Sequence, residues 1–362
     1  MDAPITAVST AVYRFPTPAP EADGTLEWKA TTAVCVTLSA EGCTGLGWTY
    51  SSRGAAAVID DELAPHVVGA SALDTAAGWS AMRRAARNLG TRGLVMQAIS
   101  AVDVAWWDLK ARVLGVALGD LMGRCRTAVP VYGSGGFTTL TDAQLAEQVG
   151  SWMEAGCTAA KIKIAEARGT RTDRDLHRTR RLRELCDPDT QLMVDANGGY
   201  TVGQARRVGA VLDELDVVWF EEPVSSDDTS GLASVRRALT CDVAAGEYAA
   251  TVDDVTALLP VVDCLQLDAT RCGGYTGFLR GAALAESAHL DVSAHCAPSL
   301  HAVVAAAVPH LRHVEWFVDH ARLEPQLLVD VPEVHGGALH PSAEGLGHGM
   351  TVNGGAHQWQ VA

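Results

Sequence analysis

The chain has 362 residues and a mass of 38.0 kDa, with 48% hydrophobic and 20% charged residues, enough for about two globular domains with a large core. Its 28 Lys and Arg against 43 Asp and Glu give a net charge of −15. This balance argues against nucleic acid as a partner, because phosphate binding needs clustered basic charge, and it suits a protein that collects carboxylates around a cation.

Signals for membranes and secretion are missing from the sequence. The apolar runs are shorter than the about 20 residues that span a bilayer, and the start MDAPITAVST lacks a basic segment followed by an apolar block. The nine cysteines are odd in number and include no CxxC pair, a pattern typical of free thiols in a reducing compartment. We therefore expect a cytoplasmic protein that does not bind a membrane.

The first part of the chain combines strand and helix patterns. Residues 5–15 and 30–42 are rich in Val and Thr with partial alternation, which indicates strands. The segment 15–28 between them holds three prolines and is expected to be a loop, whose Trp28 is either exposed or covers something. Residues 92–113 place apolar side chains at spacings of three or four, which predicts an amphipathic helix. We expect an α+β domain over residues 1–125.

From residue 127 onward, strand patterns alternate with helical ones. The helix expected after the first strand begins at Thr141, where Gln144 completes a capping box. Such alternation predicts βαβ units and a parallel sheet. An open doubly-wound sheet is the alternative, but the sequence has no glycine-rich phosphate loop, and it also lacks GxxxxGK[ST], GxSxG and HExxH motifs. About eight strands are expected, which favours a closed barrel; they lie near residues 128–136, 158–164, 191–199, 217–223, 241–248, 263–269, 290–296 and 313–317.

Seven successive barrel strands end in a side chain capable of chemistry. Any one of these alone is more often a helix cap or a solvated residue. Together they converge on the C-terminal rim of a barrel, where the active sites of such folds lie, and burying so many charges without a function would be costly. In chain order the residues are Lys161 with Lys163, Asp195, Glu221, Glu247, Asp268, His295 and Glu315.

Three of these residues predict a metal site. Asp195, Glu221 and Glu247 lie on neighbouring strands, and three close carboxylates repel one another unless a cation joins them. Hard oxygen ligands favour Mg²⁺, whereas zinc prefers nitrogen or sulfur and calcium usually takes more ligands.

The strands on either side of this site carry basic groups. Lys163 and His295 are expected to face each other across the barrel, with Lys161 lowering the pKa of Lys163 so that it acts as a base. Asp268 can orient His295 through the other ring nitrogen. Glu315, if protonated, could donate a hydrogen bond to a developing oxyanion.

The chain resembles the enolase superfamily, mandelate racemase subgroup. The resemblance spans nearly the whole chain and rests on a set of motifs in the family's order: AISAVDVAWWDLKARVLG (98–115), KIKI (161–164), VDAN (194–197), WFEEP (219–223), GEY (246–248), QLDATRCGGYTG (266–277), SAH (293–295) and VEW (314–316). The tail sequence AEGLGHGM departs from the family, which often has a proline before GLG.

The resemblance implies a modified (β/α)₇β barrel over residues 126–320, a capping α+β domain, and a C-terminal segment 321–362 that packs back on that domain. It implies Mg²⁺ on the three carboxylates. It also implies Lys163 as a base assisted by Lys161, the His295–Asp268 dyad on the other face of the substrate α-carbon, and Glu315 supporting the substrate carboxylate. The expected substrate contacts are Ser134, Asn197 and Trp28, and the expected assembly is a homo-oligomer, either a dimer or an octamer.

The substrate implied by the resemblance is a small carboxylate, and the shared step is removal of the proton α to its carboxyl group. Dehydration of an acid sugar to a 2-keto-3-deoxy acid is the leading expectation. Racemisation or epimerisation of a 2-hydroxy acid and cycloisomerisation of a sugar acid or lactone are the alternatives. A non-catalytic binding protein would be expected to have lost part of the ring of charges. A Schiff-base aldolase would not need three metal carboxylates.

Overall fold

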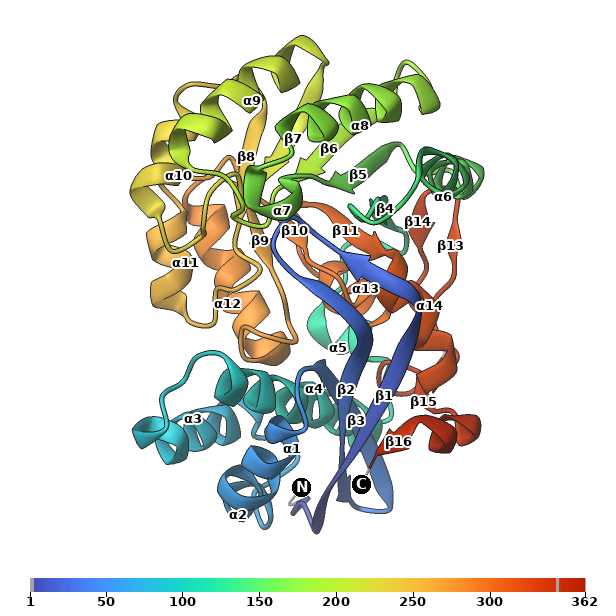
Figure 1. The fold of residues 1–362 in the computed structure, drawn as a ribbon. Coiled ribbons are helices and arrows are strands. Elements are labelled where there is room, and N and C mark those ends of the chain that lie inside the picture. The colour runs from blue at the N-terminus through green and yellow to red at the C-terminus, as the bar shows by residue number, and fades with distance from the viewer. Residues whose placement is uncertain (1–2, 343–344, 362) are drawn as a thin grey trace.

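The computed structural model describes residues 3–342 and 345–361 (Figure 1). Its N-terminal part is an antiparallel sheet of β1 (Ala7–Ala22), β2 (Glu27–Ala40) and β3 (Cys43–Tyr50), against which the long helix α4 (Leu94–Leu114) packs. Gly47 permits this close approach, because a Cβ there would lie 2.1 Å from the carbonyl oxygen of Ala101 in α4. The remaining helical segments before the barrel are α1 (Gly54–Val58), the π-helical η1 (Ile59–Leu63), α2 (Ala64–Val67), α3 (Thr75–Ala85), η2 (Ala86–Asn88) and α5 (Leu118–Met122).

A closed parallel barrel follows, as predicted. Each strand pairs with the next in chain order, and β11 pairs back with β4 to close the ring. Within the described residues the strands of the ring number eight: β4 (Val129–Gly135), β5 (Ala159–Lys163), β6 (Gln191–Asp195), β7 (Val217–Glu221), β8 (Asp242–Ala245), β9 (Cys264–Leu267), β10 (Asp291–Ala294) and β11 (Leu311–Phe317).

Helices connect the strands along the outside of the barrel (Figure 1). The capping box predicted at Thr141 and Gln144 is present and begins the first of them. The connecting helices are α6 (Asp142–Glu154), α7 (Glu166–Gly169), α8 (Thr172–Leu185), α9 (Val202–Glu214), α10 (Thr229–Arg236), α11 (Val252–Leu258), α12 (Gly274–Ser287) and α13 (Pro298–Ala305), and α14 (Val318–Leu327) follows β11. None of the helices in the described part of the chain is long and apolar enough to cross a membrane.

The C-terminal segment touches both parts of the molecule. Its short strand β14 (Ala338–Leu339) pairs with β4 of the barrel, and β16 (Gln360–Val361) pairs with β1. The other short strands are β12 (Leu328–Val329), β13 (Val334–His335) and β15 (Thr351–Val352), with the 3₁₀ segment η3 (Gly354–Trp359) preceding β16.

The hairpin of β1 and β2 reaches the mouth of the barrel (Figure 1). Its tip is joined to the barrel by backbone hydrogen bonds, 2.8 Å from Thr138 N to Ala22 O and 2.9 Å from Arg168 N to Gly24 O. These bonds fix the loop 15–28, much of which is strand rather than the loop expected from its prolines. The hairpin therefore forms part of the wall above the C-terminal ends of the barrel strands.

Candidate active site

Three buried carboxylates meet at the C-terminal end of the barrel. Asp195 is the last residue of β6, Glu221 is the last residue of β7, and Glu247 lies two residues beyond β8. Their ligand oxygens all lie within 4.8 Å of one another. The register explains this meeting, because Asp195 pairs directly with Glu221 in a parallel ladder. This is the group of residues from which the sequence analysis predicted a metal site.

The charge around these carboxylates favours a bound cation. The cationic side chains there are Lys161, Lys163 and Arg271, with His295 as a fourth when it is protonated. They are outnumbered by six buried carboxylates, Asp195, Glu221, Glu222, Glu247, Asp268 and Glu315. Glu222 Oε1 is buried without a hydrogen-bond donor among the described residues, and the group facing Glu247 Oε2 is His295 Nε2, at 3.3 Å. Burial, and after it Asp195, raises the pKa of Glu221. A divalent cation with hard oxygen ligands would compensate these charges, so the residues fit Mg²⁺.

The two lysines of β5 differ in depth. Lys163 lines the cavity and lies 2.5 Å from Asp195 Oδ2. Lys161 is fully buried and does not line the cavity, since its ammonium lies 2.7 Å from Glu221 and 2.8 Å from Glu315. Only Lys163 is placed to touch a substrate.

The pKa of Lys163 differs from the sequence-based expectation. Burial and the neighbouring Lys161 lower this pKa, as expected, but the carboxylate of Asp195 raises it, and the result is a pKa well above the ordinary value for lysine. The expectation considered only the second lysine, whereas the nearest charge is a carboxylate. The electrostatic state of Asp195 therefore controls the proton on Lys163.

His295 and Asp268 form the predicted dyad. His295 follows β10, Asp268 follows β9, and the imidazole Nδ1 lies 2.9 Å from Asp268 Oδ2. Thr270 donates its backbone N–H and its hydroxyl to the other carboxylate oxygen, each at 2.7 Å. With Nδ1 held in this way, His295 Nε2 is the nitrogen available for proton transfer, and it lies 3.3 Å from Glu247 Oε2.

Glu315 is placed as an acceptor and not as the protonated donor that the sequence suggested. Burial alone would raise its pKa, but the ammonium of Lys161, followed by His295 and Lys163, lowers the pKa of Glu315 well below the ordinary value. Its carboxylate accepts hydrogen bonds from Ser134 Oγ at 2.5 Å and from Cys296 N at 2.8 Å. Glu315 thus anchors the buried lysine beneath the cavity.

The cavity beside these groups has a volume of about 310 Å³. Trp28 and Asn197, two of the expected substrate contacts, line it. Ser134 does not, because it is fully buried and hydrogen-bonded to Glu315, so its expected contact with substrate needs correction. Ser134 and Glu315 lie on β4 and β11, the two strands that close the barrel, and neither lines the cavity.

Most of the lining residues were not identified from the sequence, and four of these carry polar or reactive groups near the predicted ones: Tyr50, Arg271, Cys296 and His320. Arg271 lay within a motif quoted above, three residues after Asp268, and its Nη1 lies 3.0 Å from Glu247 Oε1. Cys296 Sγ lies 3.2 Å from His295 Nε2. The other two come from β3 and α14, which carry no local sequence signal for a site.

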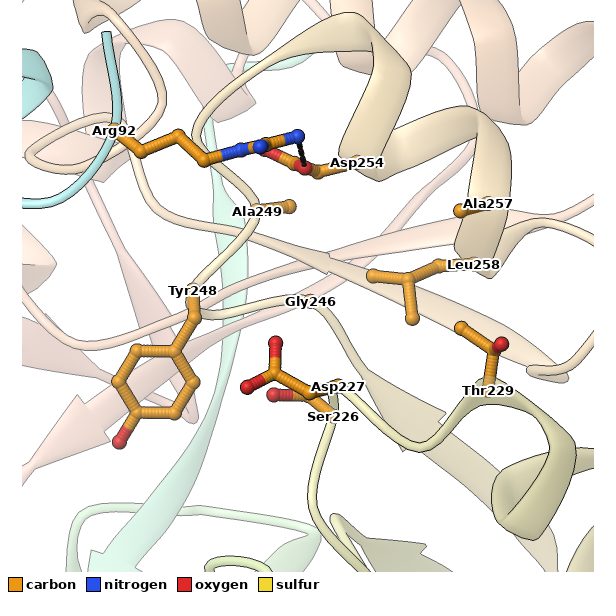
Figure 2. Close-up of a pocket in the computed structure, with 10 residues that line it drawn as sticks. All are labelled: Arg92, Ser226, Asp227, Thr229, Gly246, Tyr248, Ala249, Asp254, Ala257 and Leu258. Atoms are coloured by element: carbon orange, nitrogen blue, oxygen red, sulfur yellow. Dashed lines mark hydrogen bonds and ion pairs between the residues drawn. The ribbon is translucent and has the colours of Figure 1, made fainter. Parts of the chain in front are cut away.

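A second pocket, of about 330 Å³, is lined by Gly246, Tyr248 and Ala249 of the loop that carries Glu247 (Figure 2). Tyr248 lines both this pocket and the cavity. At the edge of the pocket Arg92, from the N-terminal part, is 2.5 Å from Asp254 of α11 (Figure 2). This ion pair joins the N-terminal part to the barrel next to the loop 246–249.

Known proteins match the chain along most of its length. Residues 5–123 match the family described as mandelate racemase/muconate lactonizing enzyme, N-terminal domain, and residues 144–356 match the family described as enolase C-terminal domain-like. A 3,6-anhydro-alpha-L-galactonate cycloisomerase from Streptomyces coelicolor is 33% identical over 341 residues, which cover 90% of this chain and 92% of the relative.

Two solved structures illustrate the similarity in three dimensions. A mandelate racemase/muconate lactonizing enzyme-like protein from Rubrobacter xylanophilus superposes with a TM-score of 0.95, at 40% identity and with 99% of each chain covered. An L-talarate dehydratase from Polaromonas sp. JS666, complexed with Mg and L-glucarate, gives a TM-score of 0.90 at 29% identity, covering 99% of this chain and 98% of that one.

Proposed function

The chain belongs to the mandelate racemase subgroup of the enolase superfamily, and from this we propose that it dehydrates an acid sugar to a 2-keto-3-deoxy acid. The observation that carries the proposal is one cavity lined by Lys163, His295 and Glu247, with the other two carboxylates of the cluster directly beside it. A base, an acid and a cation site in one cavity are the groups that α-proton removal needs.

We propose that Asp195, Glu221 and Glu247 hold Mg²⁺, the cofactor of this family. When bound, Mg²⁺ supplies positive charge at the substrate carboxylate and takes up the charge of Asp195, which otherwise keeps the proton on Lys163. The buried Lys161 and Glu315 act as positioning residues, because neither lines the cavity.

In the proposed reaction Lys163 Nζ takes the α-proton, and the electrons of that C–H bond move into the carboxylate to give an enediolate. His295 Nε2 then donates a proton to the β-hydroxyl, which leaves as water while the electrons return to form a carbon–carbon double bond. The resulting enol tautomerises to the 2-keto acid. Asp268 holds His295 in the orientation that this step requires.

Cycloisomerisation is the second candidate, favoured by the 33% identity to the anhydrogalactonate cycloisomerase. Here the same lysine and histidine would act on a substrate whose β-oxygen belongs to a ring, so that the bond broken opens an ether and no water leaves. Racemisation or epimerisation would result if His295 returned a proton to the α-carbon and no β-oxygen left.

The test is to incubate the Mg²⁺-loaded enzyme with a panel of acid sugars, anhydro acids and lactones and to detect 2-keto acids as semicarbazones. We expect an acid sugar without a ring to give product, and Lys163→Ala to give none. Product from anhydro acids only would replace dehydration by cycloisomerisation. Exchange of the α-proton in D₂O without 2-keto acid would indicate an epimerase or racemase.

A further inference from the structure

The wall of the cavity that faces the barrel rim comes from the N-terminal hairpin, β3 and the start of α14. We call this the cap-side wall, formed by Trp28, Thr31, Thr32, Tyr50, Asp319 and His320. A substrate whose reacting carbons lie beside Lys163 and His295 would direct the rest of its chain toward this wall. The chemistry of the wall therefore selects the substrate.

The cap-side wall is acidic. Asp319 and Glu21 are both buried and share a single cation, Arg322, which lies 2.8 Å from Glu21 Oε1 and is also paired with Asp319. Arg322 does not line the cavity, and no Lys or Arg of the described residues lines the cap-side wall. Two carboxylates therefore share one guanidinium behind this wall, and burial raises the pKa of both, which shows that further negative charge is disfavoured there.

His320 offers this wall a neutral hydrogen-bond donor. Its Nδ1 accepts the backbone N–H of Ala297 at 3.0 Å, so Nδ1 carries no proton and the ring is the neutral tautomer with hydrogen on Nε2. The imidazole stacks on Tyr50, with ring centroids 3.7 Å apart. Tyr50 is itself fixed, because its hydroxyl donates to Glu324 at 2.9 Å. His320 Nε2–H is thus a donor of set direction among the residues that line the cavity.

The two cationic side chains that do line the cavity lie on its barrel side and already face carboxylates. Arg271 lies 3.0 Å from Glu247 and 3.3 Å from Asp268. Lys163 lies 2.5 Å from Asp195. Both therefore lie at the reacting end of the site, and neither belongs to the cap-side wall that would meet a second carboxylate at the far end of a substrate.

Resting on the proposed function, we propose that the substrate is a monocarboxylate whose uncharged, hydroxylated tail binds the cap-side wall, with His320 Nε2–H donating to a tail hydroxyl. A dicarboxylate would place its second negative charge against Asp319 and its neighbour Glu21, and like charges in a partly desolvated site disfavour binding. A hydroxyl group, in contrast, can both accept from His320 and donate to the carboxylate of Asp319.

The first experiment separates binding from turnover. Lys163→Ala loaded with Mg²⁺ is titrated calorimetrically with three pairs that differ only at carbon 6: gluconate and glucarate, galactonate and galactarate, mannonate and mannarate. We expect the aldonate of the tightest-binding pair to bind at least tenfold more tightly than its aldarate. Equal or tighter binding of the aldarate, or binding of no member, overturns the inference.

The wild-type enzyme is assayed with the same six acids, so that a failure of the proposed function is distinguished from a failure of the inference. Aldonate-selective binding without 2-keto acid formation would contradict dehydration and leave the tail assignment standing. Turnover of an aldarate in preference to its aldonate would support dehydration and contradict the tail assignment.

Two variants of His320 then separate a contact in the cavity from a structural role. His320→Gln places an N–H donor near the position of Nε2, whereas His320→Asn keeps an acceptor near Nδ1 for Ala297 and removes the donor. If His320 donates to the substrate tail, Gln retains aldonate binding within about threefold and Asn loses about tenfold. The opposite order, with Asn better than Gln, overturns this role.

A third variant tests the acidic wall without touching His320. Asp319→Asn keeps the shape of the side chain and removes one negative charge, so the ratio of aldonate to aldarate affinity should fall by at least threefold. An unchanged ratio in a protein that retains its circular dichroism spectrum and thermal midpoint would overturn the electrostatic part of the inference.

Discussion

The ammonium of Lys161 lies 2.8 Å from the carboxylate of Glu315, and both side chains are fully buried beneath the cavity floor. The same ammonium lies 2.7 Å from Glu221 Oε2 and 3.1 Å from the hydroxyl of Tyr132. One lysine thus connects the carboxylate cluster proposed to bind Mg²⁺ with the strand that closes the barrel. The pair belongs to the support of the site and not to its reacting surface.

Replacing Lys161 should lower the stability of the fold, because the lysine supports the site and does not touch the substrate. Lys161→Met leaves Glu221 and Glu315 buried without their common cation, and breaking a buried ion pair typically costs about 3–5 kcal/mol. We expect the free energy of unfolding in urea to fall by about that amount. Lys161→Met/Glu315→Gln should recover part of it, because one unpaired charge is removed. A loss below about 1 kcal/mol in the single variant would contradict this role.

Metal binding can be followed without activity. A ligand that binds only the folded state raises its stability, so Mg²⁺ at about 100 times its dissociation constant should add about 2.7 kcal/mol and raise the thermal midpoint. Glu221→Gln should lose both this shift and turnover, and EDTA should abolish turnover of the wild type until Mg²⁺ is restored. Asp227→Asn, at an exposed aspartate outside the cluster, is the matched control. Full activity in a metal-free preparation would refute the site.

Much of the candidate site was predictable because parallel strands of a barrel end on one rim. The order Lys163, Asp195, Glu221, Glu247, Asp268 and His295 in the sequence becomes neighbouring positions on that rim. The fold followed from the same alternation of strands and helices. The roles of these six residues as metal ligands, bases and acids stay predictions.

The depth of each side chain below the cavity was not predictable from this pattern. Residues two apart on a strand point the same way but lie about 6.6 Å apart along it, so Lys161 sits a layer below Lys163. Glu315 was expected at the end of its strand, yet β11 continues to Phe317, and the glutamate lies two residues before that end, where it accepts a hydrogen bond from the buried Ser134. The sequence carried no signal for the point along each strand at which its side chains reach the cavity.

The cap-side wall could not be found from the sequence either. It joins Thr31 to Asp319 across 288 residues, through a hydrogen bond from the threonine hydroxyl to the carboxylate. Such contacts depend on how the hairpin docks over the barrel, and no local periodicity encodes docking. Of its residues only Trp28 was singled out beforehand, as an expected substrate contact.

Lys163 is expected to be essential for turnover and dispensable for the fold. It lines the cavity, so Lys163→Ala should lose turnover by about 10²–10⁴-fold, the range of general acid–base catalysis. With Mg²⁺ bound, Asp195 keeps a cationic partner, so the Mg²⁺-loaded variant should have a thermal midpoint close to that of the Mg²⁺-loaded parent. ¹H NMR in D₂O checks the role directly, because the α-proton of recovered substrate should no longer exchange. Turnover within tenfold of the parent would show that another group is the base.

Asp268→Asn tests the orientation of His295. The amide cannot stabilise the imidazolium as the carboxylate does, and it permits the wrong tautomer, so kcat should fall by roughly 10²–10⁴-fold with little change in KM. His295→Asn should lose at least as much. If Asp268→Asn raised KM and left kcat unchanged, the aspartate would contact the substrate and would not act through the histidine.

The last prediction concerns pH and Glu324, which is buried and accepts hydrogen bonds from Tyr50 and from the backbone of Ser299. Burial raises the pKa of Glu324 to about 7, whereas a glutamate in an unfolded chain has a pKa of about 4.3. The folded state therefore holds this proton more tightly than the unfolded chain does. The contribution of Glu324 to the free energy of unfolding is fully present below about pH 4.3 and is lost as the pH rises through about 7.

One unit of pKa difference corresponds to about 1.4 kcal/mol. The loss in the free energy of unfolding attributable to Glu324 is therefore about 3 kcal/mol between pH 4 and 8. Glu324→Gln keeps a neutral acceptor for Ser299 and cannot ionise, so its free energy of unfolding should fall less over this range than that of the wild type. The measurement is urea unfolding of both proteins at half-unit steps of pH. Since every other titrating group is common to the two proteins, the difference between the curves isolates this carboxyl. Parallel curves would show that Glu324 ionises in the folded state at its ordinary pKa.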